Sequence, residues 1–440
     1  MQTLRKESRK IEPRQLPGFY WDADRQRYFP LSSKPKTFTP SQASSQQLQE
    51  VDNDDEVPPP KENRKRRRTE RTAHGKLERM KMGMNYGARA RIAHELSMSC
   101  IQSSCRYPCG SAVLWPQGGS ITSFCVSDTA EGRHVVTGDS RGWLYSSLHN
   151  TENASRSKFH HYGEWLPELN VASEISNVMM DSKRCVATSF GPTSKIIVKD
   201  LTSTEIFMLT PGDRIIHDVW SASLFEKSLV LGMRKKAVYI KDFDHLMPVK
   251  NIDTQSDVFA VHRQRNSVLC GCRNGSIKLY DLRGGDFGLD LLESKFRQKP
   301  TSVNYLNVVR DWQLLASTLR GDLEMFDLRF ARHTGTPILT FTGHVNSFTT
   351  RLGTAVDPSE NFIFAAGQDS RIRAWSLQTG NPLQLCNDLS TAVNIDSTFP
   401  APIRELRVTD DREGMTLWVA SGGHLYTFDA GPSQIGAMDI

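Results

Sequence analysis

The sequence feature that most constrains the fold is a ten-residue phrase that occurs twice. Residues 274–283 read N-G-S-I-K-L-Y-D-L-R, and residues 320–329 read R-G-D-L-E-M-F-D-L-R. Each phrase has a turn glycine, an alternating strand, an aromatic residue and then Asp-x-Arg, and the aromatics Tyr280 and Phe326 are 46 residues apart. A unit repeated at this period buries its apolar face only by stacking on neighbouring copies.

Similar strand endings recur from about residue 112 onward. They lie 39 to 53 residues apart, near Ser147, Lys199, Lys241, Tyr280, Phe326, Trp375 and Phe428. A repeat of about 40–45 residues that ends near a Trp-Asp-like dipeptide is typical of a WD40 blade. We therefore expect an all-β, seven-bladed WD40 propeller over residues 111–440, with three weak blades first. The strand 111–115 is expected to close the ring by pairing with the last blade.

The N-terminal extension divides by composition. Residues 1–35 contain an aromatic phrase, 16–31, with apolar residues on both sides of a polar turn, which predicts a hairpin or an aromatic docking segment. It would pack either on the propeller wall or on a partner. Residues 36–75 are rich in Ser, Gln, Pro and acidic residues and are predicted to be a disordered linker. Residues 76–110 are predicted to be a helical segment.

Basic residues are concentrated in one part of the chain. The net charge is +6, yet residues 61–100 alone carry +8. The linker ends in a basic tract of five residues, which are Arg64, Lys65, Arg66, Arg67 and Arg68. Such a tract is a candidate for nuclear import or for weak contact with nucleic acid. The expected location is the nucleus, with the cytoplasm as a second location.

The helix predicted over residues 76–98 has an apolar stripe at three- and four-residue steps. The stripe consists of Leu77, Met80, Met84, Ile92 and Leu96. Gly83 and Gly87 weaken the helix by about 1 kcal/mol each. Such a helix needs a surface to pack on, which is either an adaptor protein or the chain's own propeller.

We find no signature of an enzyme, a cofactor or a membrane protein. No phosphate-binding loop, nucleophile elbow or zinc-protease motif occurs, and no apolar run reaches 18 residues. Cys100, Cys105 and Cys109 lack the usual spacing of a structural zinc site. His344, Asp369 and Trp375 fit a hydrogen-bond network that ties loop to strand in a blade, and we assign no catalytic residue and no metal ligand.

The two Asp-x-Arg boxes allow two interpretations. In one, Asp281 and Asp327 cap turns, and Arg283 and Arg329 make surface ion pairs of little energetic value. In the other, the two Arg side chains project from one rim and clamp carboxylates or carbonyls of a partner. Their repetition on consecutive blades favours a partner-binding rim.

The paired boxes, Tyr280–Arg283 and Phe326–Arg329, resemble those of the WD40 substrate receptors of cullin-4 RING ubiquitin ligases. The run from Leu16 to Asp22, with Arg27-Tyr-Phe, is similar to the N-terminus of one branch of that family. The resemblance implies that the boxes bind the adaptor damaged-DNA-binding protein 1. It also implies a non-catalytic scaffold that links an unknown client protein to the ligase. The alternative is a nuclear ribonucleoprotein or chromatin scaffold with a nucleic-acid-binding basic tail.

Overall fold

A computed structural model describes sixteen segments of the chain. They are residues 19–22, 27–30, 86–104, 108–113, 119–129, 132–149, 164–181, 183–212, 215–245, 247–284, 288–292, 301–330, 335–347, 351–383, 398–410 and 414–431. These segments fall into two units, Met1–Glu78 and Arg79–Ile440. Within the described residues, the first unit contains one hairpin, and the second contains a helix and seven sheets.

The second unit is a seven-bladed β-propeller of four-stranded antiparallel sheets. The first blade consists of β4 (Ile121–Thr129), β5 (Gly132–Asp139), β6 (Trp143–His149) and β7 (Leu166–Asn170). The second blade consists of β8 (Ile175–Asp181), β9 (Arg184–Ser189), β10 (Ile196–Asp200) and β11 (Ile206–Leu209). The third blade consists of β12 (Ser221–Phe225), β13 (Ser228–Gly232), β14 (Lys236–Asp242) and β15 (Met247–Asp253).

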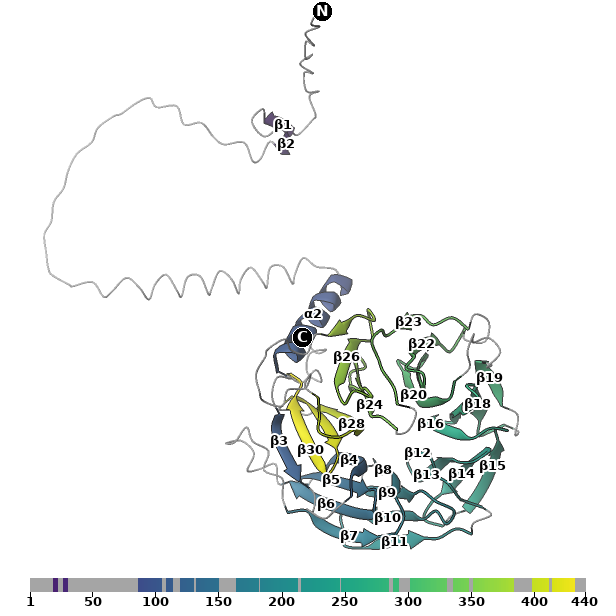
Figure 1. Cartoon of the computed structure of the whole chain (residues 1–440). Helices are drawn as coiled ribbons and strands as arrows, with labels where there is room; N and C mark the ends of the chain where they lie inside the picture. The colour runs from purple at the N-terminus through teal and green to yellow at the C-terminus, as the bar shows by residue number, and fades with distance from the viewer. Residues whose placement is uncertain are drawn as a thin grey trace, which may run out of the picture. The chain divides into compact units, whose positions relative to one another are not determined.

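The fourth to sixth blades follow the same plan. The fourth blade consists of β16 (Val258–Gln264), β17 (Ser267–Cys272), β18 (Ile277–Asp281) and β19 (Leu289–Leu292). The fifth consists of β20 (Val303–Val309), β21 (Gln313–Thr318), β22 (Leu323–Asp327) and β23 (Leu339–Thr340). The sixth consists of β24 (Thr354–Val356), β25 (Phe362–Ala366), β26 (Ile372–Ser376) and β27 (Pro382–Leu383). The first strand of each blade lies at the centre of the ring and the fourth at its periphery (Figure 1).

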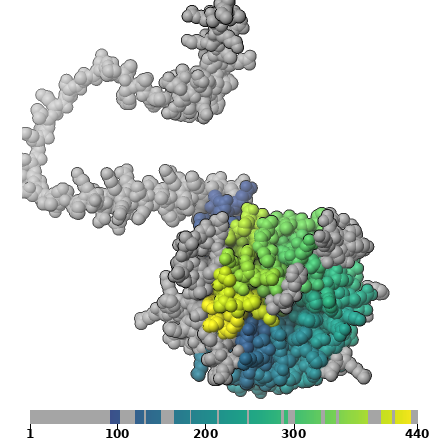
Figure 2. Space-filling view, in the orientation of Figure 1, coloured from purple at the N-terminus to yellow at the C-terminus, as the bar shows by residue number. Residues whose placement is uncertain are grey.

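The seventh blade joins the two ends of the propeller. It consists of β28 (Ile403–Asp410), β29 (Met415–Ser421), β30 (His424–Asp429) and, as its outer strand, β3 (Pro108–Val113). The pairing of β3 with β30 confirms the closure predicted from the sequence, although the strand begins before residue 111. Figure 2 shows the yellow last blade directly beside the blue first blade.

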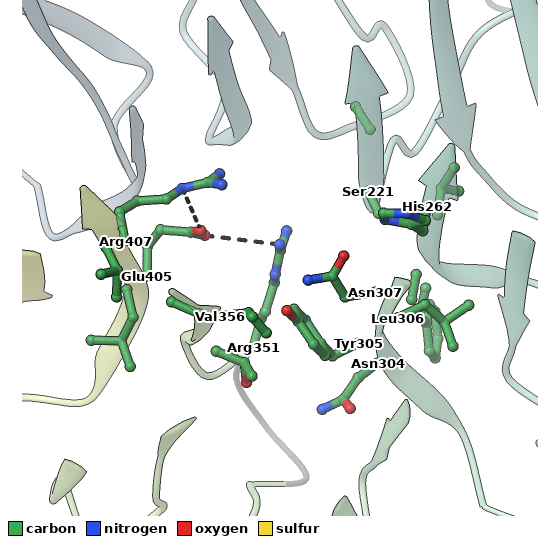
Figure 3. A pocket seen from close by; sticks show the side chains of 18 residues that line it. Ser221, His262, Asn304, Tyr305, Leu306, Asn307, Arg351, Val356, Glu405 and Arg407 are labelled. Carbon is green, nitrogen blue, oxygen red and sulfur yellow. Dashed lines mark ion pairs between the residues drawn. The ribbon is translucent and has the colours of Figure 1, made fainter. Parts of the chain in front are cut away.

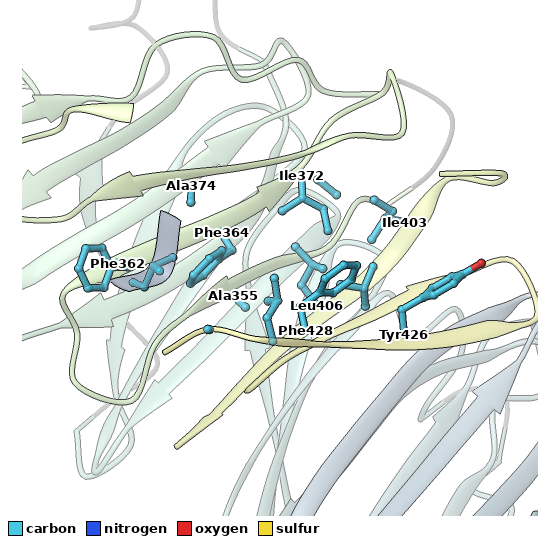
Figure 4. Packing of buried hydrophobic residues seen from close by; sticks show 14 of the residues in the cluster. Ala355, Phe362, Phe364, Ile372, Ala374, Ile403, Leu406, Tyr426 and Phe428 are labelled. Carbon is cyan, nitrogen blue, oxygen red and sulfur yellow. The ribbon is translucent and has the colours of Figure 1, made fainter. Parts of the chain in front are cut away.

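Apolar runs in the middle of each blade explain where the core lies. The second strands β5, β13, β21 and β25 are buried at every position. In β13 and β25 the sequence is a short, largely apolar run, which is typical of a strand covered on both faces, whereas β5 and β21 also bury polar side chains such as Thr137 and Thr318. The core clusters lie between adjacent blades, and the cluster between blades six and seven includes Phe362, Phe364, Ile403 and Phe428 (Figure 4).

The seven strand endings read from the sequence all lie on the third strands of the blades, from β6 to β30. Two of these strands follow turns at Gly275 and Gly321, whose φ angles of 85° and 100° lie in the left-handed region that favours glycine. The repeat therefore predicted both the number and the spacing of the blades.

The two faces of the ring carry different connections. Neighbouring strands are antiparallel, so the third strand ends on the face that also carries the turn between the first two strands. This arrangement is seen where Leu328 N donates to Trp312 O at 2.8 Å. We name this side, which carries residues 281–283 and 327–329, the Arg face. The side that carries the connections between blades is the opposite face.

The first unit contains the predicted hairpin. Strand β1 (Phe19–Asp22) pairs antiparallel with β2 (Arg27–Pro30), and Tyr20 lies opposite Phe29. The strands therefore span the two aromatic halves of the phrase.

Candidate functional site

The Asp at the end of a third strand caps the turn that follows it. Oδ1 of Asp281 accepts a hydrogen bond from the backbone N–H of Arg283, and Oδ1 of Asp327 accepts one from Arg329, both at 2.9 Å. The same bond recurs on three further blades, with the acceptors Asp200, Asp242 and Asp429. The Asp is thus explained by turn formation. Among these five blades, the fourth and fifth differ from the others by the Arg that stands two residues after the Asp.

Each Arg side chain folds back onto the Asp of its own turn as a two-pronged ion pair. Nε and Nη2 of Arg283 donate to Asp281 at 3.1 and 2.9 Å, and those of Arg329 donate to Asp327 at 2.9 and 2.7 Å. These charge-assisted bonds lower the pKa of Asp281 to about 2 and also lower that of Asp327. Both pairs therefore persist at neutral pH. Each carboxylate occupies the Nε–Nη2 edge of its guanidinium, and the two Arg side chains are still 72% and 58% exposed, so their other edge can meet a partner.

Arg329 has aromatic neighbours in addition to its Asp. Its guanidinium carbon lies 4.1 Å from the ring centre of Trp312 and 5.6 Å from that of Phe330. Both distances are within the range of a cation–π contact. The side chain of Phe330 is itself exposed. The Arg face at blade five therefore combines a fixed positive charge with accessible apolar surface.

The fold places the two boxes at equivalent positions of adjacent blades. The turns of these blades are also linked on the Arg face, because Gln264 Nε2 donates to Asp311 Oδ1 at 2.9 Å. The turn-capping interpretation of the boxes is thus satisfied by the geometry. That geometry also leaves both guanidinium groups exposed, which the partner-binding interpretation requires.

Helix α2 (Tyr86–Ser104) packs on blades six and seven through a face that the apolar stripe did not predict. His94 is buried, forms a hydrogen bond of 2.7 Å between its Nε2 and Ser376 Oγ, and stacks on Phe362 at 5.1 Å. Ile101 is 1% exposed and belongs to the core between these blades. The predicted end at residue 98 is wrong, because Met98 and Ile101 continue the same buried face for another turn.

The predicted stripe is described only in part. Ile92 and Leu96 are 39% and 59% exposed, so they point away from the propeller. The helix lies on the Arg face, since its contact Ser376 ends β26. Leu77, Met80 and Met84, as well as the basic tract at residues 64–68, lie outside the described residues.

The network predicted in blade six is structural. His344 Nδ1 lies 3.2 Å from Gly321 O, and Trp375 Nε1 donates to Thr342 O at 3.0 Å. Asp369 forms its ion pair with Arg373, at 2.6 Å. The three residues thus bond to different partners, and the bonds of Trp375 and Asp369 each tie a loop to β26.

A charged group at the centre of the ring has no recognisable signal in the sequence. Arg351, Glu405 and Arg407 come from blades six and seven and line one cavity. Each occupies a polar position next to or within a first strand, which is indistinguishable in sequence from a surface position. Only the closure of the ring brings them together.

Two further findings concern the described residues alone. They include no group of three or more His, Cys, Asp or Glu side chains arranged to hold a metal ion. None of the helices found in them has the length and apolar character needed to cross a membrane.

Comparisons with known proteins agree with the fold. The family model "WD domain, G-beta repeat" matches residues 335–376, which lie mostly in blade six. The WD40 β-propeller domain of Doa1 superposes with a TM-score of 0.55 at 19% identity, covering 74% of this chain and 97% of that chain. WD repeat-containing protein 82 of Drosophila melanogaster is 31% identical over 141 residues, which are 32% of this chain and 40% of that protein.

A longer match agrees with the resemblance drawn from the boxes and the aromatic phrase. DDB1- and CUL4-associated factor 4 of Bos taurus is 24% identical over 84% of this chain and 78% of its own length. The protein of the same name from Homo sapiens is 23% identical over 94% of this chain and 86% of its own length. The chain is therefore a WD40 β-propeller protein that resembles DDB1- and CUL4-associated factor 4 over most of its length.

Proposed function

We propose that this protein is a substrate receptor of a cullin-4 RING ubiquitin ligase. It acts without catalysis, binds the adaptor damaged-DNA-binding protein 1 through its Arg face, and holds a client protein on another surface. The observation that carries the proposal is the pair of exposed guanidinium groups of Arg283 and Arg329, each held by its own Asp on adjacent blades. The similarity to proteins named DDB1- and CUL4-associated factor 4 supports it.

The geometry of the boxes suits a protein interface. A side chain that is already fixed loses less conformational entropy on binding than a mobile one. Arg and aromatic residues also dominate the energetics of many interfaces. Trp312 and Phe330 beside Arg329 supply apolar surface that excludes water around the charge.

Helix α2 extends this surface on the Arg face. Its His94 and Ile101 face the propeller, while Ile92 and Leu96 remain exposed. We propose that these two side chains form a second, apolar part of the adaptor interface. An amphipathic helix that presents apolar residues at four-residue steps is a common recognition element.

The test is adaptor binding by the double variant Arg283→Ala/Arg329→Ala, measured by co-purification and by biolayer interferometry with purified adaptor. We expect affinity to fall at least tenfold. Arg273→Ala is the matched control, because Arg273 is an exposed Arg that pairs with Asp257 at 3.1 Å on the opposite face. The control should bind like the parent.

Unchanged affinity in the double variant, with an unchanged melting temperature, would show that the boxes serve turn formation alone. Arg283→Lys/Arg329→Lys adds a finer comparison. Lysine keeps the charge but lacks the fork that pairs with Asp281 and Asp327. We therefore expect it to lose much of the affinity as well.

A further inference from the structure

The centre of the ring contains a polar cavity of about 270 Å³. It is lined by the first strands of blades three to seven, β12, β16, β20, β24 and β28, and by Arg351 before β24. Figure 3 shows the side chains converging on an open space between these strands. A volume of this size holds one or two amino-acid side chains or several water molecules.

Three lining side chains carry a formal charge, and their charges do not cancel. Glu405 lies between two Arg residues, with 3.3 Å to Arg407 Nε and 3.8 Å to Arg351 Nη2 (Figure 3). Burial raises the pKa of Tyr305 to about 12 and lowers that of His262 to about 4, so both are neutral at pH 7. The lining therefore has a net charge of +1.

Part of this positive charge has no partner among the residues that the structure describes. Arg351 is held by a bond of 2.8 Å from its Nη1 to Asn177 Oδ1. Within the described residues, the two Nη groups of Arg407 donate to no acceptor, although 41% of its side chain is exposed to the cavity. Glu405, in contrast, is almost completely buried. The guanidinium group of Arg407 therefore faces the cavity, and the buried carboxylate of Glu405 holds it from behind.

Aromatic side chains lie at the end of the cavity nearer the opposite face. Trp220 contacts Phe190 at 4.7 Å and Phe259 at 5.1 Å between ring centres. Phe259 lines the cavity, and Trp220, which directly precedes β12, is partly exposed. A ligand that reaches the charges from this side therefore passes an apolar platform.

We propose that this cavity binds the carboxylate of a peptide, with Arg407 and Arg351 as its donors and a neighbouring apolar residue on Trp220. A single carboxylate neutralises the net charge of +1. A phosphate group carries a charge of about −1.5 to −2 and would leave the cavity with a net negative charge. The aromatic platform also favours a peptide over a small free anion. The assignment of this cavity as the client site of the receptor rests on the proposed function. Peptide binding itself does not require the adaptor.

Fluorescence polarisation with the full chain tests the proposal. The probes are labelled, C-terminally amidated peptides of sequence Gly-Ser-Phe-Xaa-Gly-Ser-Gly, with Glu or Gln as Xaa, and a Gln peptide with a free C-terminus. We expect either the Glu peptide or the free-terminus peptide to bind at least tenfold more tightly than the amidated Gln peptide. The first result assigns a side-chain carboxylate and the second a terminal one, and equal binding of all three overturns the proposal.

Variants separate binding from folding. Arg407→Gln should weaken the preferred peptide at least tenfold. Glu405→Gln should tighten it several-fold, because a competing carboxylate is removed, whereas structural damage would weaken it. Retained affinity in Arg407→Gln, or weaker binding in Glu405→Gln, contradicts the assignment. Arg283→Ala/Arg329→Ala should leave peptide binding unchanged, so failure of the adaptor proposal and failure of this one give different results.

Discussion

Replacing Ile101 by Ala tests whether α2 is an integral part of the propeller. Ile101 is 1% exposed and packs in the cluster that includes Phe362 and Phe428. The change removes three carbon atoms, worth about 0.8 kcal/mol each in transfer free energy. The cavity left behind adds to this cost. We therefore expect the free energy of unfolding to fall by about 2–4 kcal/mol.

Ile92→Ala on the same helix is the matched comparison. Ile92 is exposed, so its replacement should change the free energy of unfolding by no more than about 0.5 kcal/mol. Urea unfolding of both variants, followed by tryptophan fluorescence, measures the difference. Hydrogen exchange over residues 86–104 shows whether α2 separates before the ring unfolds. Equal effects of the two substitutions would refute the idea that α2 is anchored by its Ile101 face.

Three further predictions concern other parts of the chain. Because burial lowers the pKa of His262 to about 4, its contribution to stability is complete above pH 6.5 and is lost as the pH falls towards 4. Between pH 7.5 and 5 the free energy of unfolding should fall by up to about 2 kcal/mol for this reason. The melting temperatures at the two pH values should therefore differ less in His262→Asn than in the parent. Changing residues 64–68 to Ala should move a fluorescent fusion out of the nucleus, and a fusion that stays as nuclear as the parent would contradict the import role. Leu96→Glu should weaken adaptor binding at an unchanged melting temperature, because Leu96 is exposed on α2, which lies on the Arg face; unaltered binding would exclude α2 from that interface.

The repeating part of the fold was accessible from the sequence because the third strands of the later blades carry a recognisable local pattern. A turn glycine such as Gly321, an alternating strand and an aromatic such as Phe326 recur within ten residues. The fourth strands were not predicted. Strands as short as β23 (Leu339–Thr340) and β27 (Pro382–Leu383) form because a neighbouring strand is already in place.

The face of α2 could not be predicted from periodicity. His94 was not read as a buried position, because imidazole is polar. Its burial depends on Ser376 and Phe362, which are distant in sequence and supply a hydrogen bond and a stacking surface. An apolar count therefore favoured Ile92 and Leu96, which the structure leaves exposed.

The two candidate sites also differ in whether the sequence alone reveals them. Arg283 and Arg329 were found because the box repeats within the sequence. Arg351 and Arg407 were missed because the cavity between them exists only after blades six and seven have taken their places in the ring. A site built from a repeated local motif is readable in one sequence, whereas a site built by ring closure is not.

The pairing of β3 with β30 has a consequence for the synthesis of the protein. Strand β3 leaves the ribosome roughly 300 residues before its partner does, which corresponds to about 15–60 s at common rates of translation. During that time β3 has no partner strand and the ring is incomplete. Any chain that terminates before His424 lacks the partner altogether and keeps open sheet edges. A chain truncated before His424 therefore exposes strand edges that the closed ring covers.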